Sequence, residues 1–279
     1  MQTVLVVGAT GQTGRSIVAG LLESNNFRVA AVIRPESVHK DIVNELRNSG
    51  VDIRVVDLGN IDHRLDDALQ GIHAVVSAIS ASKLDLQRPI VDAAKKAGVK
   101  RFVPSDFGSA CTRGVRPRFD QKLDIHEYIK SSGIPYTFID VGWWMQLILP
   151  FTDKNLTLYE GLRCMYEGNR QLYEGNFKTA LTDLRDIGRF VARIIADPRT
   201  FNAYIFCGGE ELTQQEIFDI SEKVTGKTVE IIPVSMWIRG DNRMDNARKI
   251  EYGGAMDAKA LYPDFSPRRL IDFAREFYG

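Results

Sequence analysis

The sequence has little of the chemistry that builds disulfide frameworks or metal sites. Only 3 cysteines and 4 histidines occur among its 279 residues. The cysteines form no Cys-x-x-Cys pair and leave an odd number, which fits reduced, independent thiols. The histidines are scattered, and none lies at the spacing of a metal ligand set. We therefore expect neither a disulfide nor a bound metal. These residues are Cys111, Cys164, Cys207, His39, His63, His73 and His126.

The chain also lacks an excess of charge of either sign. Lysine and arginine number 36, aspartate and glutamate also number 36, and the formal net charge is +0. Nucleic acids and anionic lipids attract proteins through basic surface, and this composition supplies no general attraction of that kind. We therefore expect no nucleic-acid partner.

Long hydrophobic runs are absent as well. A membrane-spanning helix needs about 20 mostly apolar residues, whereas 26% of this chain is charged and 44% is hydrophobic. The apolar stretch Val4–Val7 is too short for a signal peptide, and no basic region precedes it. We expect a cytoplasmic protein that does not associate with membranes.

The first half of the chain alternates short β-branched runs with amphipathic stretches of helix length. This pattern is typical of right-handed βαβ units around a parallel sheet. Six strands and five helices are predicted up to Gly142, as in a doubly wound Rossmann domain with two mononucleotide-binding halves. The predicted strands are Thr3–Ala9, Phe27–Arg34, Asp52–Leu58, His73–Ile79, Arg101–Phe107 and Tyr136–Gly142, and the predicted helices are Gly14–Glu23, Glu36–Asn48, Leu65–Leu69, Leu84–Ala97 and Phe119–Ser131.

Beyond Gly142 the regular alternation ends. We expect an α/β fold of two parts, with a mostly parallel Rossmann sheet in residues 1–142 and a smaller α/β substrate lobe, interleaved with the sheet, in residues 143–279. A cleft between the parts is the expected ligand site. A tandem YEGN in the second part predicts two turns of a hairpin. The lobe's other predicted elements are helices at Asp183–Ala196, Thr213–Val224 and Pro267–Phe277, a strand at Val229–Ser235, and the YEGN turns at Tyr166–Asn169 and Tyr173–Asn176.

Three glycines follow the first predicted strand at three-residue intervals, in the string GATGQTG. Their position between a strand and a helix predicts a dinucleotide-binding turn, rather than a purely structural one. Gly8 permits the tight turn, Gly11 allows the backbone to approach a pyrophosphate, and Gly14 allows close packing of the helix. Amides at the helix N-terminus, with Thr10, Gln12 and Thr13, then face the phosphates.

The end of the second predicted strand indicates which dinucleotide binds. An acidic residue there holds the ribose of NAD, whereas a basic one accommodates the 2′-phosphate of NADP. Arg34 occupies the position, so we predict NADPH/NADP+ as the cofactor; the alternative is an exposed arginine at a helix start. Ala78 and Ile79, at the end of the fourth strand, are further predicted cofactor contacts, although packing of the strand end explains their small size equally well.

Together these motifs resemble a known family. The glycine string, Arg34, the stretch KRFVPSDFG at Lys100–Gly108 and the stretch FDQKLDIHEYIKSSGIPYTFI at Phe119–Ile139 resemble the NmrA-like, isoflavone-reductase-like branch of atypical short-chain dehydrogenases/reductases. This branch includes phenylcoumaran benzylic ether and pinoresinol–lariciresinol reductases. The resemblance implies an NADPH-binding Rossmann domain, a smaller substrate lobe and a catalytic lysine in an FxxK motif. Lys122 of Phe119–Lys122 takes that role by position.

From the chemistry of lysine alone, we expect the Lys122 ammonium to donate a proton or to stabilise a developing anion. The alternative is a surface lysine. His126 lies four residues later on the same helical face, where an imidazole could relay a proton, tune the lysine or contact substrate. We favour a solvent-facing histidine. Ser105 and Asp106 end the fifth strand and could position a water molecule or the cofactor ribose; Asp106 could equally cap the next segment.

Trp143, Trp144 and Met145 follow the sixth strand, where substrate loops of doubly wound folds emerge. They are candidate substrate contacts that could form an aromatic wall, with hydrophobic core as the alternative. We predict an NADPH-dependent reductase of an aromatic or conjugated small molecule, a ketone, enone, imine or benzylic ether. The alternatives are an NADP(H)-binding redox-sensing regulator of the NmrA type without turnover, and a biosynthetic enzyme that uses the cofactor for imine reduction or cyclisation. The oligomeric state is left open.

Overall fold

The computed structural model describes residues 1–150, 171–173, 178–230, 232–234 and 253–279. By their contacts the residues divide into two compact units, which are described separately below. The domain boundary expected after residue 142 stays a prediction. Unit 1 comprises Met1–Phe107, Cys111–Ile139 and Ile187–Ile205, and unit 2 comprises Gly108–Ala110, Asp140–Asp186 and Phe206–Gly279.

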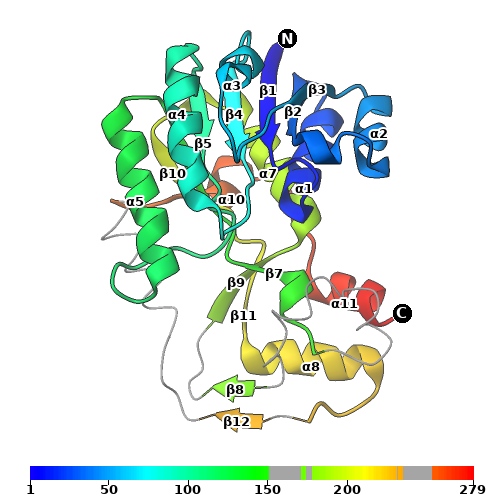
Figure 1. Ribbon diagram of the computed structural model, residues 1–279. Coiled ribbons are helices and arrows are strands. Elements are labelled where there is room, and N and C mark those ends of the chain that lie inside the picture. The colour runs from blue at the N-terminus through cyan, green and yellow to red at the C-terminus, as the bar shows by residue number, and fades with distance from the viewer. Residues whose placement is uncertain (151–170, 174–177, 231, 235–252) are drawn as a thin grey trace. The chain divides into compact units, whose positions relative to one another are not determined.

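Unit 1 is built on a five-stranded parallel sheet with the order β3-β2-β1-β4-β5 (Figure 1). The central strand β1 pairs with both neighbours, so that Val4 lies opposite Val29 on one side and Ala74 on the other. The strands are β1 Gln2–Val7, β2 Phe27–Ile33, β3 Asp52–Val55, β4 Ala74–Ser77 and β5 Arg101–Val103.

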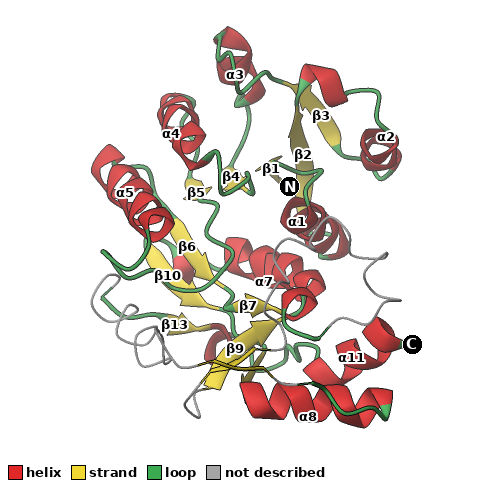
Figure 2. Cartoon of the chain, turned by 60° about the horizontal axis from the view of Figure 1, so that its bottom comes forward, coloured by secondary structure: helices red, strands yellow, loops and turns green. Residues whose placement is uncertain are grey.

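Helices cover both faces of this sheet, with α3, α4 and α5 on one face and α1, α2 and α7 on the other (Figure 2). Because both faces are covered, β1 is an unbroken apolar run, and Val4–Val7 has no exposed surface. The helices are α1 Gln12–Glu23, α2 Asp41–Asn48, α3 His63–Ala68, α4 Gln87–Lys96, α5 Pro117–Ser132 and α7 Leu184–Ala196, with the short 3-10 turns η1 Pro35–Ser37, η2 Leu84–Leu86 and η5 Pro198–Thr200.

The strand order confirms the predicted doubly wound α/β fold. The chain moves outward from β1 to β2 and β3, and then returns to the other side of β1 as β4. In such sheets ligands bind at the carboxyl ends of the two strands where the order reverses, here β1 and β4. The predicted strands run past the observed ends. At β5 the physical cause is Pro104, which has no N–H to donate to a ladder.

The predicted helix over Glu36–Asn48 is wrong in its first turn, because η1 and α2 are separate elements. Beyond β5 the hydrogen-bonding pattern continues: Phe102 bridges Tyr136, and its N–H donates to the Pro135 carbonyl at 2.8 Å. That bridge leads into β6 Thr137–Asp140, whose neighbour in unit 1 is β10 Ala203–Phe206.

A buried arginine anchors the end of α7 within unit 1. The Arg101 side chain is 1% exposed, and its Nη1 donates to the Ile194 carbonyl at 2.7 Å and to Thr200 Oγ1 at 2.9 Å. Its Nη2 donates to the Asp197 carbonyl at 3.2 Å, and its Cζ lies 3.6 Å from the centre of the Phe201 ring. The guanidinium therefore satisfies carbonyls that the helix end leaves without intrahelical donors.

Unit 2 contains a small sheet in the order β11-β9-β7, in which β9 is parallel to β7 and antiparallel to β11. A capping box of Thr213 and Glu216 begins α8. The elements are β7 Trp143–Trp144, η3 Met145–Leu147, β8 Gln171–Tyr173, β9 Lys178–Thr182, β11 Glu210–Thr213, α8 Gln214–Thr225, β12 Ile232–Val234, β13 Met256–Asp257, α10 Ala258–Leu261 and α11 Leu270–Tyr278.

The apolar core of unit 2 is formed by β9, α8, α11 and the turn after β7. The predicted YEGN turns lie outside the described residues, apart from Tyr173, which is in β8. Within the part of the chain that the structure describes, no helix is long and apolar enough to cross a membrane. The buried core residues are Met145, Leu149, Leu181, Ile217, Leu270, Phe273, Ala274 and Phe277.

Replacement of Arg101 by Met tests its structural role. We expect a loss of unfolding free energy of about 3 kcal/mol, because removal of the donor leaves buried carbonyls unsatisfied. Equilibrium urea unfolding followed by circular dichroism measures the change. The exposed Arg28 of β2 provides the matched control, Arg28→Met, which should unfold as the wild type does. Equal midpoints for the two variants would contradict the role of Arg101.

The buried carboxylate of Asp183 predicts acid sensitivity in unit 2. Burial by itself would raise the pKa of Asp183, but hydrogen bonds from the Arg185 side chain and backbone and from Gln146 hold that pKa below its ordinary value of 3.8. A depressed carboxyl pKa contributes stability that is present above the unfolded-state pKa and is lost as the pH falls through the folded-state pKa. We therefore expect the wild-type melting temperature to fall below about pH 4 more steeply than that of Asp183→Asn.

Candidate functional site

The turn after β1 needs glycine at two positions because of its own packing. Gly8 has a φ of +85°, and a Cβ there would lie 2.5 Å from the Ala78 carbonyl oxygen at the end of β4. A Cβ on Gly14 would lie 2.1 Å from the Gly8 carbonyl oxygen. Gly11 N–H donates to that same carbonyl at 3.0 Å, which closes the turn. Backbone therefore contacts backbone at this point of the sheet.

Gly11 has a different environment from the other two glycines. It is exposed, and the nearest atom to a Cβ there is the Gly8 carbonyl oxygen at 3.4 Å, so the space that it leaves faces outward. Gly11 is also the N-cap of α1, and among the described residues no side chain caps this helix. Its first turn carries no acidic residue.

The amides of Gln12, Thr13 and Gly14 and the positive end of the helix dipole are therefore not neutralised by a carboxylate from the first turn of α1 itself. That arrangement binds phosphate groups. The residues present fit a dinucleotide pyrophosphate, in which Gly11 permits close approach. The contacts of Thr10, Gln12 and Thr13 with a cofactor stay predictions.

The end of β4 is fixed against this turn. Ala78 N–H donates to the Val7 carbonyl at 2.7 Å, and the Ala78 carbonyl covers Gly8. The Ile79 carbonyl accepts the Ser105 hydroxyl at 2.8 Å, which ties the ends of β4 and β5 together. Ala78 and Ile79 thus lie at the β1/β4 edge, where the sequence predicted cofactor contacts.

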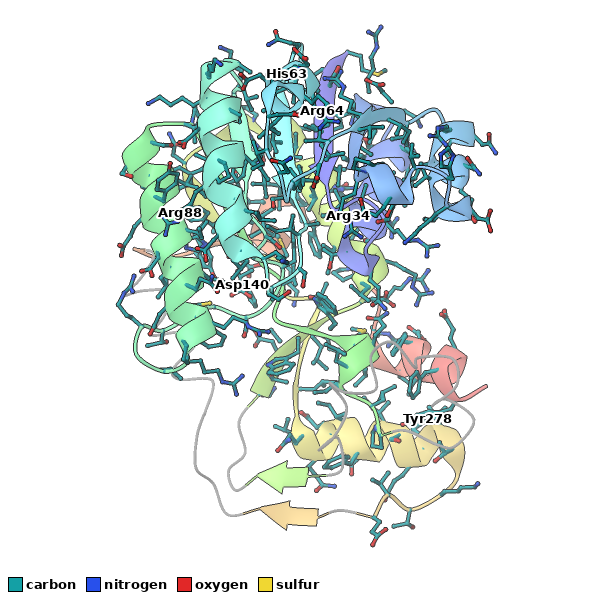
Figure 3. The ribbon with its side chains drawn as sticks, in the orientation of Figure 1. Arg34, His63, Arg64, Arg88, Asp140 and Tyr278 are labelled. Carbon is teal, nitrogen blue, oxygen red and sulfur yellow. The ribbon has the colours of Figure 1, made fainter. Side chains whose placement is uncertain are left out.

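Arg34 lies directly after β2, as its predicted role requires (Figure 3). Its side chain is 61% exposed, and Nη1 is 3.0 Å from Glu36 Oε1. An exposed ion pair of this kind is worth at most about 1 kcal/mol, so a phosphate can compete with Glu36 for the guanidinium. The preference for NADP that Arg34 implies stays a prediction.

Lys122 is held by the turn after β5. It lies on α5, which begins with Pro117 at its first position and ends at Gly133 with a φ of 76°. The Lys122 side chain is partly buried, and its Nζ donates to the Asp106 carbonyl at 2.9 Å. An ammonium has three donors, and this contact uses one of them. No pattern in the sequence indicated that Lys122 would donate to this carbonyl.

The expectation of a solvent-facing His126 is wrong. The residue is 3% exposed, and its ring stacks on Phe138 of β6 with centroids 3.8 Å apart. Nε2 contacts a carboxylate oxygen of Asp106, which is itself buried at 8% exposed. The ring is buried because Phe138 and Asp106 together cover a flat, polar-edged side chain. A substrate contact by His126 stays a prediction.

The candidates that follow β6 belong to unit 2. Trp143 and Trp144 form β7, which pairs with Leu181 and Thr182 of β9. Trp143 is 39% exposed, whereas Met145 has no exposed surface and packs in the core of the unit. The structure therefore shows the alternative role for Met145, that of a core residue. Substrate contacts by these three residues stay predictions.

A basic pocket of about 680 Å³ lies beside the start of α5. Its arginines flank Pro117 and lie close to the turn that follows β4. The residues that line this pocket were not among the predicted site residues; the two arginines beside Pro117 are the feature of the sequence that marks its position. Its lining residues are Ala81, Ser82, Arg116, Pro117, Arg118 and Gln121.

The sequence model of the NmrA-like family matches residues 1–267. The chain belongs to the NmrA-like family. Among its relatives in this family, asnovolin J 5′,6′-dehydrogenase of Aspergillus novofumigatus is 35% identical over 98% of this chain and 94% of that protein. Pinoresinol reductase 1 of Arabidopsis thaliana is 31% identical over 98% of this chain and 96% of that protein. The resemblance inferred from the motifs is confirmed.

Solved structures of reductases share the fold. Leucoanthocyanidin reductase of Vitis vinifera, in a binary complex with NADPH, matches with a TM-score of 0.79 and 22% identity over 99% of both chains. AtPrR2 with NADP+ and (+)-pinoresinol matches with a TM-score of 0.75 and 26% identity over 99% of this chain and 98% of that chain.

Arg34→Ala tests the cofactor preference of this NmrA-like chain. We expect about a tenfold to hundredfold loss of NADPH affinity, because a charge-assisted hydrogen-bonded pair with the 2′-phosphate is lost. NADH affinity should not change. Glu36→Gln should bind NADPH more tightly, because it removes the competing carboxylate.

Isothermal titration with both dinucleotides measures these changes, and Arg28→Ala at the opposite end of β2 is the control. Equal affinity of the wild type for NADH and NADPH would show that Arg34 does not select the cofactor.

Proposed function

We propose that this protein is an NADPH-dependent reductase that transfers a hydride to an aromatic or conjugated small molecule. One observation carries the proposal: a continuous series of contacts joins the phosphate-binding turn to Lys122 within unit 1. Gly8 packs on Ala78, and the next carbonyl, that of Ile79, accepts a hydrogen bond from the Ser105 hydroxyl. The carbonyl of Asp106, which follows Ser105, accepts a hydrogen bond from the Lys122 ammonium. The amides that would bind the anion follow β1, and the carbonyl that holds the candidate proton donor follows β5, so both lie beyond the carboxyl ends of the parallel strands.

The relatives support both the cofactor and the class of reaction. The two relatives above are named as a dehydrogenase and a reductase, and both match almost the full length of this chain. AtPrR2, at 26% identity, was solved with NADP+ and an aromatic lignan, (+)-pinoresinol. By this similarity the substrate of the present chain is a ketone, enone, imine or benzylic ether attached to an aromatic or conjugated system.

The chain's own residues would divide the work of binding and catalysis. Amides of the first turn of α1 would hold the pyrophosphate, and Arg34 would hold the 2′-phosphate. When bound, NADPH supplies the hydride. Among the described residues, Lys122 uses one of its three N–H donors, on the Asp106 carbonyl. The other two donors would stabilise the negative charge that develops on the substrate and deliver a proton to it.

The exposed Trp143 would offer a flat apolar surface to an aromatic substrate. Residues 1–142 would form the cofactor domain, and residues 143–279 the substrate lobe. The protein would act in the cytoplasm without a nucleic-acid partner, because its charge is balanced and the described helices include none that could cross a membrane.

Lys122→Ala separates binding from chemistry. With a substrate identified from a panel of aromatic ketones, enones, imines and benzylic ethers, we expect kcat to fall by about a hundredfold or more. The dissociation constant for NADPH should stay within about threefold, because the amides of α1 and Arg34 supply the phosphate contacts. NADPH oxidation at 340 nm and cofactor titration provide the two readouts.

Lys130→Ala, an exposed position on the same helix, is the control and should retain activity. Unchanged turnover in Lys122→Ala would show that Lys122 has no catalytic role. A wild-type protein that binds NADPH and oxidises none of it across the panel would instead indicate the non-catalytic, redox-sensing regulator.

A further inference from the structure

We propose that Asp106 and His126 are positioning residues that hold the Lys122 ammonium in place, an inference that rests on the proposed reductase function. Lys122 and His126 lie one helical turn apart on α5, and both contact Asp106 in the turn after β5, one at its backbone and the other at its side chain. Lys122 donates to the Asp106 backbone carbonyl, and His126 contacts the Asp106 carboxylate. Residues four apart on a helix face the same side, which makes this double contact possible.

Lys122 needs an acceptor of fixed position because a lysine side chain is intrinsically mobile. Its four-carbon stem loses substantial rotamer entropy when it is held in one geometry, and a single hydrogen bond to a moving carbonyl would not fix it. The Asp106 N–H donates to the Pro104 carbonyl at 2.9 Å, so the backbone is tightly turned at this residue. Fixing the Asp106 side chain therefore also fixes the carbonyl that orients Lys122.

Burial makes the contact of His126 necessary rather than incidental. Asp106 is 8% exposed, and a buried carboxylate without a hydrogen-bonding partner is strongly unfavourable. The His126 ring cannot easily turn away from Asp106, because it is stacked on Phe138 at an interplanar angle of 12°. Phe138 in turn stacks on Tyr136 at 4.5 Å. The Phe138 ring thus restricts the His126 imidazole, which contacts the Asp106 carboxylate and so restricts the turn after β5.

The same turn is anchored to the cofactor side of the sheet. Ser105 N–H donates to Gln87 Oε1 at 2.7 Å, and the Ser105 hydroxyl donates to the Ile79 carbonyl at 2.8 Å. Gln87 is 1% exposed, which makes its amide a fixed acceptor. Displacement of Asp106 would therefore move Lys122 relative to the strand end that carries the predicted cofactor contacts. His126 acts through Asp106, since a side chain that is 3% exposed and directed at that carboxylate has little surface for a substrate.

Two polar substitutions of His126 test this inference as a matched pair. In His126→Gln the side-chain amide extends to the region of Nε2 and can donate to Asp106. In His126→Asn the shorter side chain ends near the Nδ1 position and cannot reach. Asp106→Asn is a third variant, which keeps the backbone carbonyl and removes the carboxylate charge. Circular dichroism and thermal melting establish that each variant is folded.

The first readout is independent of catalysis. The acetylation rate of Lys122 by acetic anhydride is measured by mass spectrometry in the cofactor-free protein, with the exposed Lys40 as the internal reference. In His126→Asn the Asp106 carbonyl is no longer fixed and Lys122 loses its hydrogen bond. The relative acetylation rate of Lys122 should therefore rise by about fivefold, the change expected when one hydrogen bond is lost. Asp106→Asn should raise it by less, because the amide can still accept a hydrogen bond from His126 but without the charge that strengthens the contact. His126→Gln should recover most of the wild-type protection.

The second readout uses the reaction. We expect kcat to fall in His126→Asn by about tenfold or more while the NADPH dissociation constant is retained, because a misplaced catalytic group affects chemistry more than binding. Wild-type acetylation rates in both His126→Asn and Asp106→Asn would overturn the inference, as would equal damage in the Gln and Asn variants of His126. If His126→Asn does not fold, Asp106→Asn and His126→Gln decide the outcome. Failure of the reductase proposal would leave the acetylation result standing, so the two failures are distinguishable.

Discussion

The structure depends on one close approach of backbone to backbone, between Gly8 and the Ala78 carbonyl. The parallel pairing of β1 with β4 places Val7 opposite Ser77, so the two strands end together and their exits touch. A side chain at residue 8 would separate them. Because the strand order reverses at this edge, the gap left by the diverging connections is where a dinucleotide binds in such folds.

The consequences of that approach reach Lys122 through few steps. With the end of β4 fixed, the Ile79 carbonyl can fix Ser105, and Ser105 begins the turn whose next residue accepts the lysine ammonium. Every member of this series is in unit 1. The amides at the start of α1, which are predicted to bind phosphate, are therefore joined to Lys122 by one series of contacts.

Much of the fold and part of the site could be predicted from the sequence. The apolar runs at Val4–Val7 and Ala74–Ser77 predicted buried parallel strands because each run fills both faces of a covered sheet. Element ends were less predictable, since the split at η1 depends on local turn geometry after Arg34. Of the short strands of unit 2, β12 lies within the predicted strand Val229–Ser235, whereas β7, β9 and β11 were not predicted, because strands such as the two-residue β7 are too short to show a periodic pattern.

The glycine turn, the start of the helix after it and the place of Lys122 on its helix can be predicted from the chain alone, because glycine spacing and helical periodicity are local properties. The surroundings of those residues depend on how distant segments pack together. Asp106 and His126 are separated by 20 positions, and nothing local indicates that their side chains meet under a stacked aromatic ring. Met145 was a candidate ligand contact by position, yet packing against α8 and α11 made it core. Burial is a property of what covers a residue, and the covering elements come from distant parts of the chain.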